Sequence, residues 1–111
     1  MAPEFKIIKI ETNAQNLYGW VALSNTDQPI GHIFMQEELD KKIKFMDAWV
    51  SEEFRRQGIF ASLWETRWEF VKENFKGYKA YAWSLPTSQH LLRKKGFEEG
   101  DTCIYMEKII K

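Results

Sequence analysis

The chain has 111 residues, of which 44% are hydrophobic and 15% aromatic. This length fits one domain, residues 1–111, and the apolar content supports a packed core, which excludes an intrinsically disordered chain. The 16 basic and 16 acidic side chains balance, so nothing favours general nucleic-acid binding. No apolar run is long enough to cross a membrane, and charges interrupt the apolar part of the N-terminus, unlike a signal peptide. The single Cys103 offers no disulfide and no metal cluster, so we expect a cytoplasmic protein without a metal.

The first half of the chain has the alternating hydrophobic pattern of β-strands. Residues 5–11, 17–24 and 29–36 each fit a strand, and the turn-forming run NTDQP joins the last two into a hairpin. A charged patch, EELDKK, precedes a fourth strand at residues 43–50.

From Gly58 the hydrophobic residues recur at the spacing of a helix, which we expect to end between residues 74 and 77. Charged residues, Arg67 among them, are expected to cover the rest of this helix. A fifth strand at 78–84, a second helix ending at Lys95 and a last strand at 97–110, bent at Gly100, follow. The sequence therefore predicts a mixed α/β layer fold whose late βαβ unit is parallel. The expected apolar stripe of the first helix is Phe60, Leu63, Trp64, Trp68 and Val71.

The junction between the fourth strand and the first helix, SEEFRRQG, has the properties of an anion site. The first N–H groups of a helix are free, and the helix dipole makes them attractive to phosphate. Gly58 allows the backbone to approach a ligand, and Arg55 and Arg56 add positive charge. The absence of Gly-Lys-Ser/Thr excludes a P-loop. On these residues alone, an anion site and a solvated loop are equal alternatives.

Two motifs together resemble those of the GNAT N-acetyltransferase family. VSEEFRRQGIFASLW is similar to its acetyl-coenzyme A signature, Arg/Gln-x-x-Gly-x-Gly/Ala, with Arg55 first and Gly58 central. Further along, SQHLLRKKGF resembles the family's second motif, a helix that runs into Lys-x-Gly-Phe. The resemblance covers roughly residues 42–111, and two motifs in the right order are more specific than one.

The resemblance implies a GNAT-like α+β layered fold: a mixed, mostly antiparallel sheet, two main helices and a V-shaped splay between the fourth and fifth strands. Acetyl-coenzyme A, the co-substrate, would lie in the splay, with its pyrophosphate on the N–H groups of the helix start. A backbone N–H near Val50 would polarise the thioester carbonyl. The implied coenzyme-binding residues are Trp49, Val50, Ser51, Arg55, Arg56, Gln57, Gly58, Ile59, Phe60 and Ala61.

The chain departs from the family pattern at two positions. Phe60 stands where the signature has glycine or alanine, which is tolerable because its side chain is in phase with the core face of the helix. Leu92 stands where many members have a tyrosine that protonates the leaving thiolate. Ser88 and His90, on the same expected helix, are the candidate substitutes for that tyrosine.

A third departure concerns the acceptor. Residues 12–16 are too few for the two helices that the family usually has between its first two strands, where they form a wall of the acceptor site. A more open groove fits a protein lysine or N-terminal amine better than an enclosed small amine. A partner protein, or a second copy of the chain in a homodimer, would be the other source of this wall.

Asp47 is the candidate general base. Strand alternation places it on one face with Ile43, Phe45 and Trp49, where partial desolvation would raise the pKa of its carboxyl and help it take a proton from an ammonium group. The alternative, which we favour, is an aspartate bonded to nearby backbone at a strand end or bulge.

We predict an acetyl-coenzyme A-dependent N-acetyltransferase in which an amine attacks the thioester directly while both substrates are bound. The alternative is a catalytically impaired module of the same fold that acts by binding a protein partner, as Leu92 suggests. A third alternative, an α/β interaction domain without coenzyme, requires both motifs to have arisen by chance.

Overall fold

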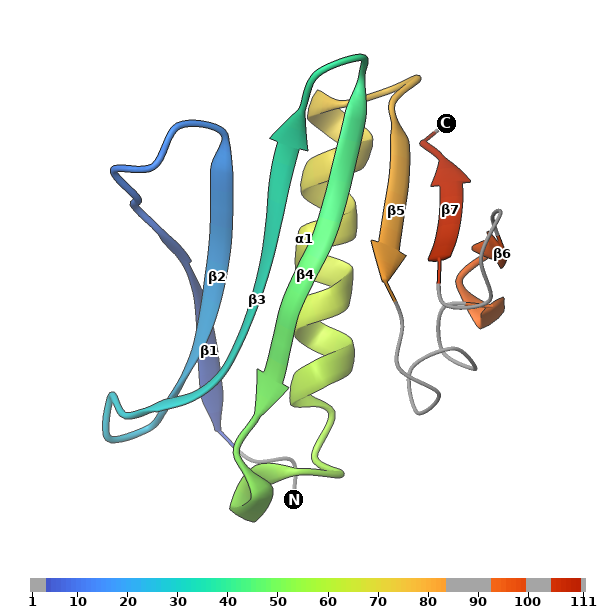
Figure 1. Ribbon diagram of the computed structural model, residues 1–111. Coiled ribbons are helices and arrows are strands. Elements are labelled where there is room, and N and C mark those ends of the chain that lie inside the picture. Colours follow the sequence, from blue (N-terminus) through green and yellow to red (C-terminus); the bar gives the residue numbers. More distant parts are fainter. Residues whose placement is uncertain (1–3, 84–92, 100–104, 111) are drawn as a thin grey trace.

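The computed structural model describes residues 4–83, 93–99 and 105–110 (Figure 1). Four strands come first, followed by a short 3₁₀ helix, one long helix and three further strands. In chain order the elements are β1 (Phe5–Ile10), β2 (Leu17–Ser24), β3 (Pro29–Glu38), β4 (Lys42–Val50), η1 (Glu52–Phe54), α1 (Ile59–Asn74), β5 (Lys79–Trp83), β6 (Glu98–Glu99) and β7 (Tyr105–Ile109).

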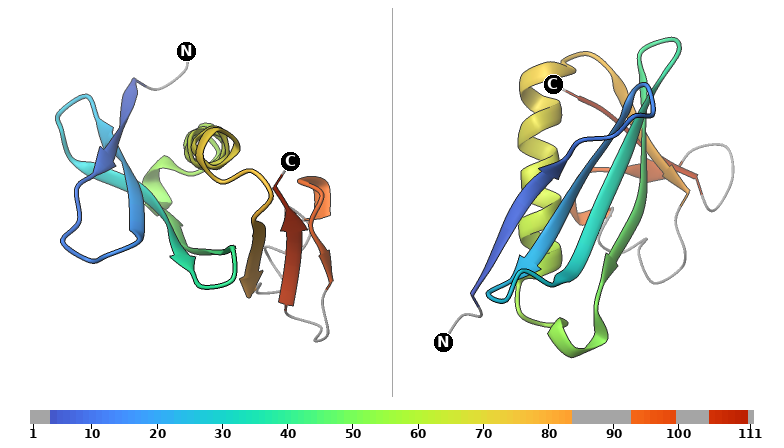
Figure 2. Two further views of the ribbon diagram at one scale, coloured as in Figure 1. Left: turned by 90° about the horizontal axis from the view of Figure 1, so that it is seen from above. Right: turned by 90° about the vertical axis from the view of Figure 1, so that its left-hand side faces the viewer.

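The seven strands form one sheet in the order β1-β2-β3-β4-β5-β7-β6. Every neighbouring pair is antiparallel except β4 and β5, which are parallel and joined through α1. The sheet curves around α1, which lies on its concave side (Figure 2). The predicted mixed sheet and its parallel βαβ unit are therefore confirmed.

The last part of the chain corrects one expectation. Residues 97–110 do not form a single bent strand, because β6 and β7 pair with each other in antiparallel fashion, Glu98 opposite Glu107. The second expected helix lies mostly outside the described residues, where only Arg93 and Lys94 have helical backbone.

Apolar side chains on one face of α1 hold the helix against the sheet. Leu63 and Val71 are completely buried, and each full burial of such a side chain is worth about 2 kcal/mol. At Gly31 of β3 an added Cβ would meet Ile59 and Leu63 at 3.4 and 3.3 Å. Odd-numbered residues in this part of β3 therefore face α1, while even-numbered residues face the other side of the sheet.

Arg67 of α1 is in the core, although its charge predicted an exposed position; its side chain is 2% exposed. The guanidinium lies 3.8 Å from the ring centroid of Phe45 and 4.6 Å from that of Trp64, and Nη1 donates a hydrogen bond of 3.0 Å to the carbonyl of Phe34. Burial lowers the pKa of Arg67 well below its usual value. Among the described residues no carboxylate pairs with it, so ring faces and one carbonyl hold this cation.

Two substitutions of Arg67 separate packing from charge. Arg67→Ala leaves a cavity between two rings and removes the donor to Phe34, so we expect a loss of about 3 kcal/mol in the free energy of unfolding. Arg67→Met fills the space and removes a desolvated charge, so the loss should be about 1 kcal/mol or less. Urea denaturation measures both, and equal losses would contradict the dominance of packing.

Candidate functional site

A β-bulge in β4 organises the site. Phe34 pairs with Met46 and His32 pairs with Trp49, so two residues of β4, Asp47 and Ala48, stand opposite the single Ile33 of β3. The extra residue reverses the alternation of β4 beyond this point.

The reversal overturns the expected common face of β4. Phe45 before the bulge is buried on the α1 side, whereas Trp49 after it is 43% exposed and lies against His32 on the opposite face. Trp49 therefore does not share the face of Ile43 and Phe45, contrary to the prediction for Asp47 and its neighbours.

The predicted splay between β4 and β5 begins near the bulge. The two strands pair only at Lys42↔Lys79, Ile43↔Ala80 and Lys44↔Tyr81, and then separate (Figure 1). Phe97 packs on the α1 side of this opening, with its ring centroid 5.7 Å from that of Phe45. For the remainder of β4, up to Val50, no strand in the described part of the chain pairs on that side.

Backbone groups of β4 point into this opening. The N–H of Ser51 donates to the carbonyl of Ile30 on β3 at 2.8 Å. Since successive N–H groups of a strand point to opposite sides, the N–H and C=O of Val50 point away from β3 and toward the open side. The Val50 carbonyl accepts a hydrogen bond of 3.0 Å from Nε of Arg55. The Val50 N–H therefore faces the opening, and its role as the oxyanion donor stays a prediction.

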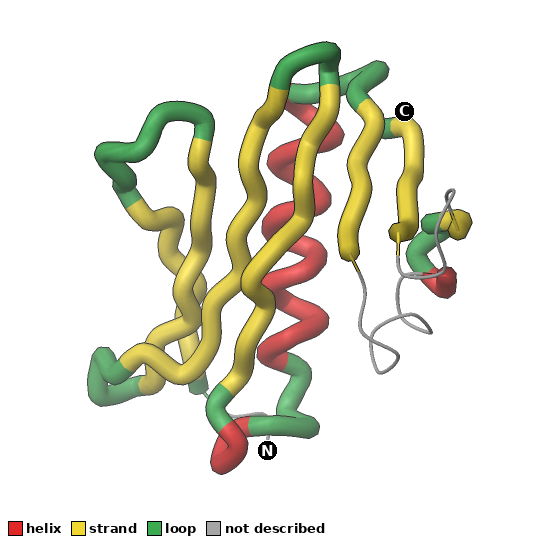
Figure 3. The backbone as a smooth tube through the Cα atoms, viewed as in Figure 1, coloured by secondary structure: helices red, strands yellow, loops and turns green. Residues whose placement is uncertain are grey.

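The loop from β4 to α1 presents the helix start to the same opening (Figure 3). Gly58 precedes the helix with φ 82° and ψ 4°, a left-handed conformation that favours glycine, and Arg56 also has a positive φ, 66°. No side chain in the described ranges caps the helix, and its first turn contains no acidic residue. The first N–H groups of α1 are therefore available to an anion.

A pocket of about 520 Å³ lies where these features meet. This volume is typical of small-molecule sites. Its lining combines backbone N–H groups at a helix N-terminus, two guanidinium groups and an apolar wall, a combination that suits a ligand with phosphates at one end and an uncharged arm at the other. The lining residues are Ala48, Trp49, Val50, Phe54, Arg55, Arg56, Gly58, Ile59, Phe60 and Ala61.

Most of the residues predicted for the coenzyme gather in this pocket. Of the ten, Ser51 and Gln57 do not line it, and Phe60 lines it while also packing against the core. Sequence reasoning missed Phe54, which does both as well. A lone aromatic residue in the charged run SEEFRR was the available signal for it.

The three catalytic candidates remain predictions. Asp47 lies at the bulge of β4, which is one of the two positions that the favoured alternative named for it. Its side chain is not among those that the structure describes. Ser88 and His90 lie outside the described residues. No described group of His, Cys, Asp and Glu side chains could hold a metal ion, and no described helix could cross a membrane.

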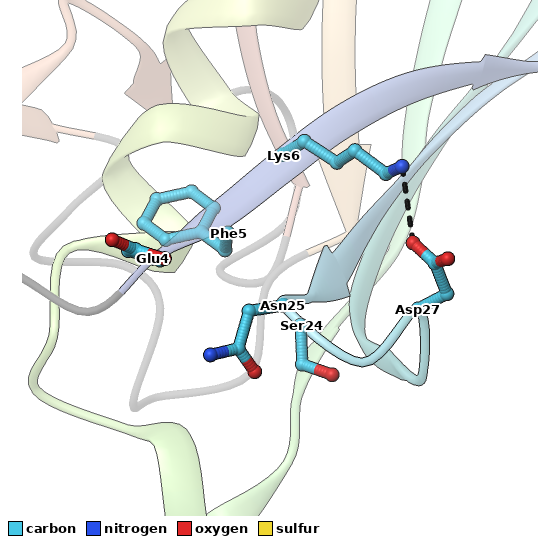
Figure 4. Close-up of a pocket in the computed structure, with 6 residues that line it drawn as sticks. All are labelled: Glu4, Phe5, Lys6, Ser24, Asn25 and Asp27. Atoms are coloured by element: carbon cyan, nitrogen blue, oxygen red, sulfur yellow. Dashed lines mark ion pairs between the residues drawn. The ribbon is translucent and has the colours of Figure 1, made fainter.

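A second pocket of about 210 Å³ lies between the start of β1 and the turn after β2 (Figure 4). Its polar groups are largely satisfied by one another. Lys6 Nζ pairs with Asp27 at 3.0 Å, and the Ser24 hydroxyl accepts the backbone N–H groups of Thr26 and Gln28 at 3.2 Å each. These contacts stabilise a turn, and we assign no function to this pocket.

Comparison with solved structures places this fold among acetyltransferases. The ribosomal-protein-S18-alanine N-acetyltransferase of Escherichia coli has a TM-score of 0.80 at 14% identity, covering 97% of this chain and 95% of its own. A GNAT acetyltransferase of Staphylococcus aureus has 0.72 at 16%, covering 86% and 69%. A GNAT N-acetyltransferase of Escherichia coli in complex with CoA has 0.68 at 19%, covering 85% and 59%.

Residues 2–97 match the model of the Acetyltransferase (GNAT) family. The match spans most of the chain, which therefore belongs to the GNAT family of acetyltransferases, as its two motifs predicted. Members of this family use acetyl-coenzyme A as the acetyl donor. No curated protein matches the sequence.

Two glycines provide a matched test of the pocket. Gly58 and Gly77 both have a positive φ, 82° and 87°, and an added Cβ at either meets nothing within 4 Å. Replacing either by alanine should destabilise the protein by about 1 kcal/mol. Only Gly58→Ala puts a methyl group into the pocket, so we expect coenzyme A affinity to fall about tenfold there and to stay unchanged in Gly77→Ala. Calorimetry measures both, and equal affinities would contradict the site.

Proposed function

We propose that the protein is an N-acetyltransferase that transfers the acetyl group of acetyl-coenzyme A to a primary amine of a protein, either a lysine or an N-terminus. The observation that carries this proposal is the pocket at the end of β4, whose lining matches the residues predicted for the coenzyme. The amine attacks the thioester directly in a ternary complex, so much of the rate enhancement comes from holding the two reactants together.

Different groups in the pocket suit different parts of the acetyl donor. The N–H groups of Ile59, Phe60 and Ala61 suit the pyrophosphate, because the helix start carries neither a cap nor an acidic side chain. Arg56 adds an exposed positive charge beside them. The Val50 N–H suits the thioester oxygen, where negative charge develops as the amine adds.

The open side of the sheet supports a macromolecular acceptor. Among the described residues, α1 covers one face of β2, β3 and β4 and no helix covers the other (Figure 2). A polypeptide can lie across such an open surface and bring its own amine to the donor, whereas a site that encloses a small amine needs a further wall. The similarity to an enzyme named for a ribosomal protein, nearly equal in length, is consistent with this choice.

A catalytically impaired binding module is the second candidate, because Leu92 stands at the usual tyrosine position. Incubation with labelled acetyl-coenzyme A and a cell lysate, followed by mass spectrometry, separates the two. Transfer to protein amines supports the enzyme. Binding of acetyl-coenzyme A with no transfer to the lysate or to a panel of amines supports the module.

A charge reversal tests the phosphate assignment. Arg56→Glu should weaken coenzyme A binding at least tenfold, because a carboxylate would meet the pyrophosphate where a guanidinium now lies. Lys76→Glu makes the same change on an exposed residue beyond the far end of α1 and should leave binding unchanged. Calorimetry on both variants decides; an equal effect would indicate only a loss of overall charge attraction.

A further inference from the structure

The pocket involves both faces of the sheet. Its helical residues lie on the α1 side, whereas the Trp49 side chain is on the opposite face, because it contacts His32 and even-numbered β3 residues point away from α1. A donor whose phosphates rest on α1 would therefore present its reactive end near the edge of β4, beside the open face.

Three rings form a row on that open face, starting at the pocket. The His32 ring centroid lies 5.4 Å from that of Trp49 and 5.3 Å from that of Phe34. His32 pairs directly with Trp49 across β3 and β4, so the imidazole is one strand away from a residue that lines the pocket. All three side chains keep part of their surface accessible, and we call them the aromatic row.

We propose that the aromatic row is the acceptor subsite: ring faces of Trp49 and Phe34 bind the incoming ammonium group, and the imidazole of His32 accepts the proton that this group must lose. The inference rests on the proposed N-acetyltransferase function and adds a residue that lies outside both sequence motifs. Ring faces attract ammonium ions, most strongly at Trp, and histidine is the side chain that ordinarily exchanges protons near neutral pH.

The proton balance of the transfer is complete with His32 in this role. The ammonium gives one proton to the imidazole, and the free amine nitrogen then forms a bond to the thioester carbon while the carbon–sulfur bond breaks. A second N–H proton leaves the nitrogen and ends on the coenzyme thiolate. The products are the acetylated amine, the coenzyme thiol and a protonated His32, which releases its proton to solvent.

The residues that pair with His32 on the two neighbouring strands are apolar. On β2 its partner is Val21, which in turn pairs with Ile8 of β1. The charged positions that the register places on this face include Lys6 of β1, Glu38 of β3, Lys42 and Lys44 of β4, Lys79 of β5 and Glu107 of β7. Lys6 pairs with Asp27, and Lys79 pairs with Glu107. Asp47, in the bulge next to the aromatic row, is the alternative proton acceptor, and the kinetic experiment below compares it with His32.

An NMR titration with n-butylammonium tests the binding role without any turnover. We expect the side-chain signals of His32 and Trp49 to shift in a saturable way, and the shift of His32 to be lost in Trp49→Leu. Ile8→Ala changes an exposed residue of the same face outside the row and should leave the titration unchanged. Unshifted signals of His32 and Trp49 would overturn the proposal.

Kinetics with n-butylamine and acetyl-coenzyme A test the proton transfer. His32→Gln should lower kcat about 100-fold and remove the fall in kcat that the proposal predicts for the wild type toward acid pH, because glutamine cannot take up the proton. Added imidazole should restore part of the rate in His32→Ala. Loss of the acid limb in Asp47→Asn, with an unchanged profile in His32→Gln, would assign the base to Asp47 instead.

Calorimetry with acetyl-coenzyme A distinguishes failure of this inference from failure of the proposed function. His32→Gln should bind the donor as the wild type does, because the imidazole is not among the pocket-lining residues. A wild type that does not bind acetyl-coenzyme A contradicts the proposed function itself. A wild type that binds and transfers, with His32→Gln equal to it in rate and pH profile, contradicts only the role of His32.

Discussion

The early end of the pairing between β4 and β5 is the constraint on which the site depends. Three residue pairs join these parallel strands, and beyond them no described strand pairs with β4 on the side away from β3. Free peptide groups at a sheet edge normally invite another strand. Here the Val50 carbonyl is bonded by Arg55, and the Val50 N–H faces the pocket, so the break in the sheet leaves a directed hydrogen-bond donor at the pocket wall.

Aromatic side chains of the core fill the α1 side of the opening between β4 and β5. Phe97, Phe45 and Trp64 contact one another at centroid separations of 5.6 to 6.0 Å. Arg67 adds a guanidinium on the faces of Phe45 and Trp64 and a hydrogen bond to Phe34 beside the bulge.

The sequence predicted the layer architecture, the first five strands, α1 and most of the pocket lining, because alternation, helical spacing and the motif around Gly58 are local signals. It failed where a single inserted residue or a tertiary contact decides. The sequence raised a bulge only as one alternative for Asp47, and the local pattern did not show that it would move Trp49 to the other face of the sheet. Arg67 was placed on the surface because charge usually means exposure, and only the rings around it explain its burial. The reversal between β6 and β7 depends on their pairing with each other, which a short run of two residues cannot signal.

The position of Phe97 also has a consequence for biosynthesis. β1 to β4 form by successive antiparallel neighbours, so their contacts are available as soon as each strand leaves the ribosome. Phe97 and Ile110, which bonds back to Tyr78 through its N–H, come late in the chain. A nascent chain can thus form the antiparallel strands β1 to β4 and pack α1 against them before Phe97 reaches the opening between β4 and β5. The α1 side of this opening should therefore reach its final packing only after Phe97 has emerged, whereas every residue that lines the pocket at the end of β4 is made earlier.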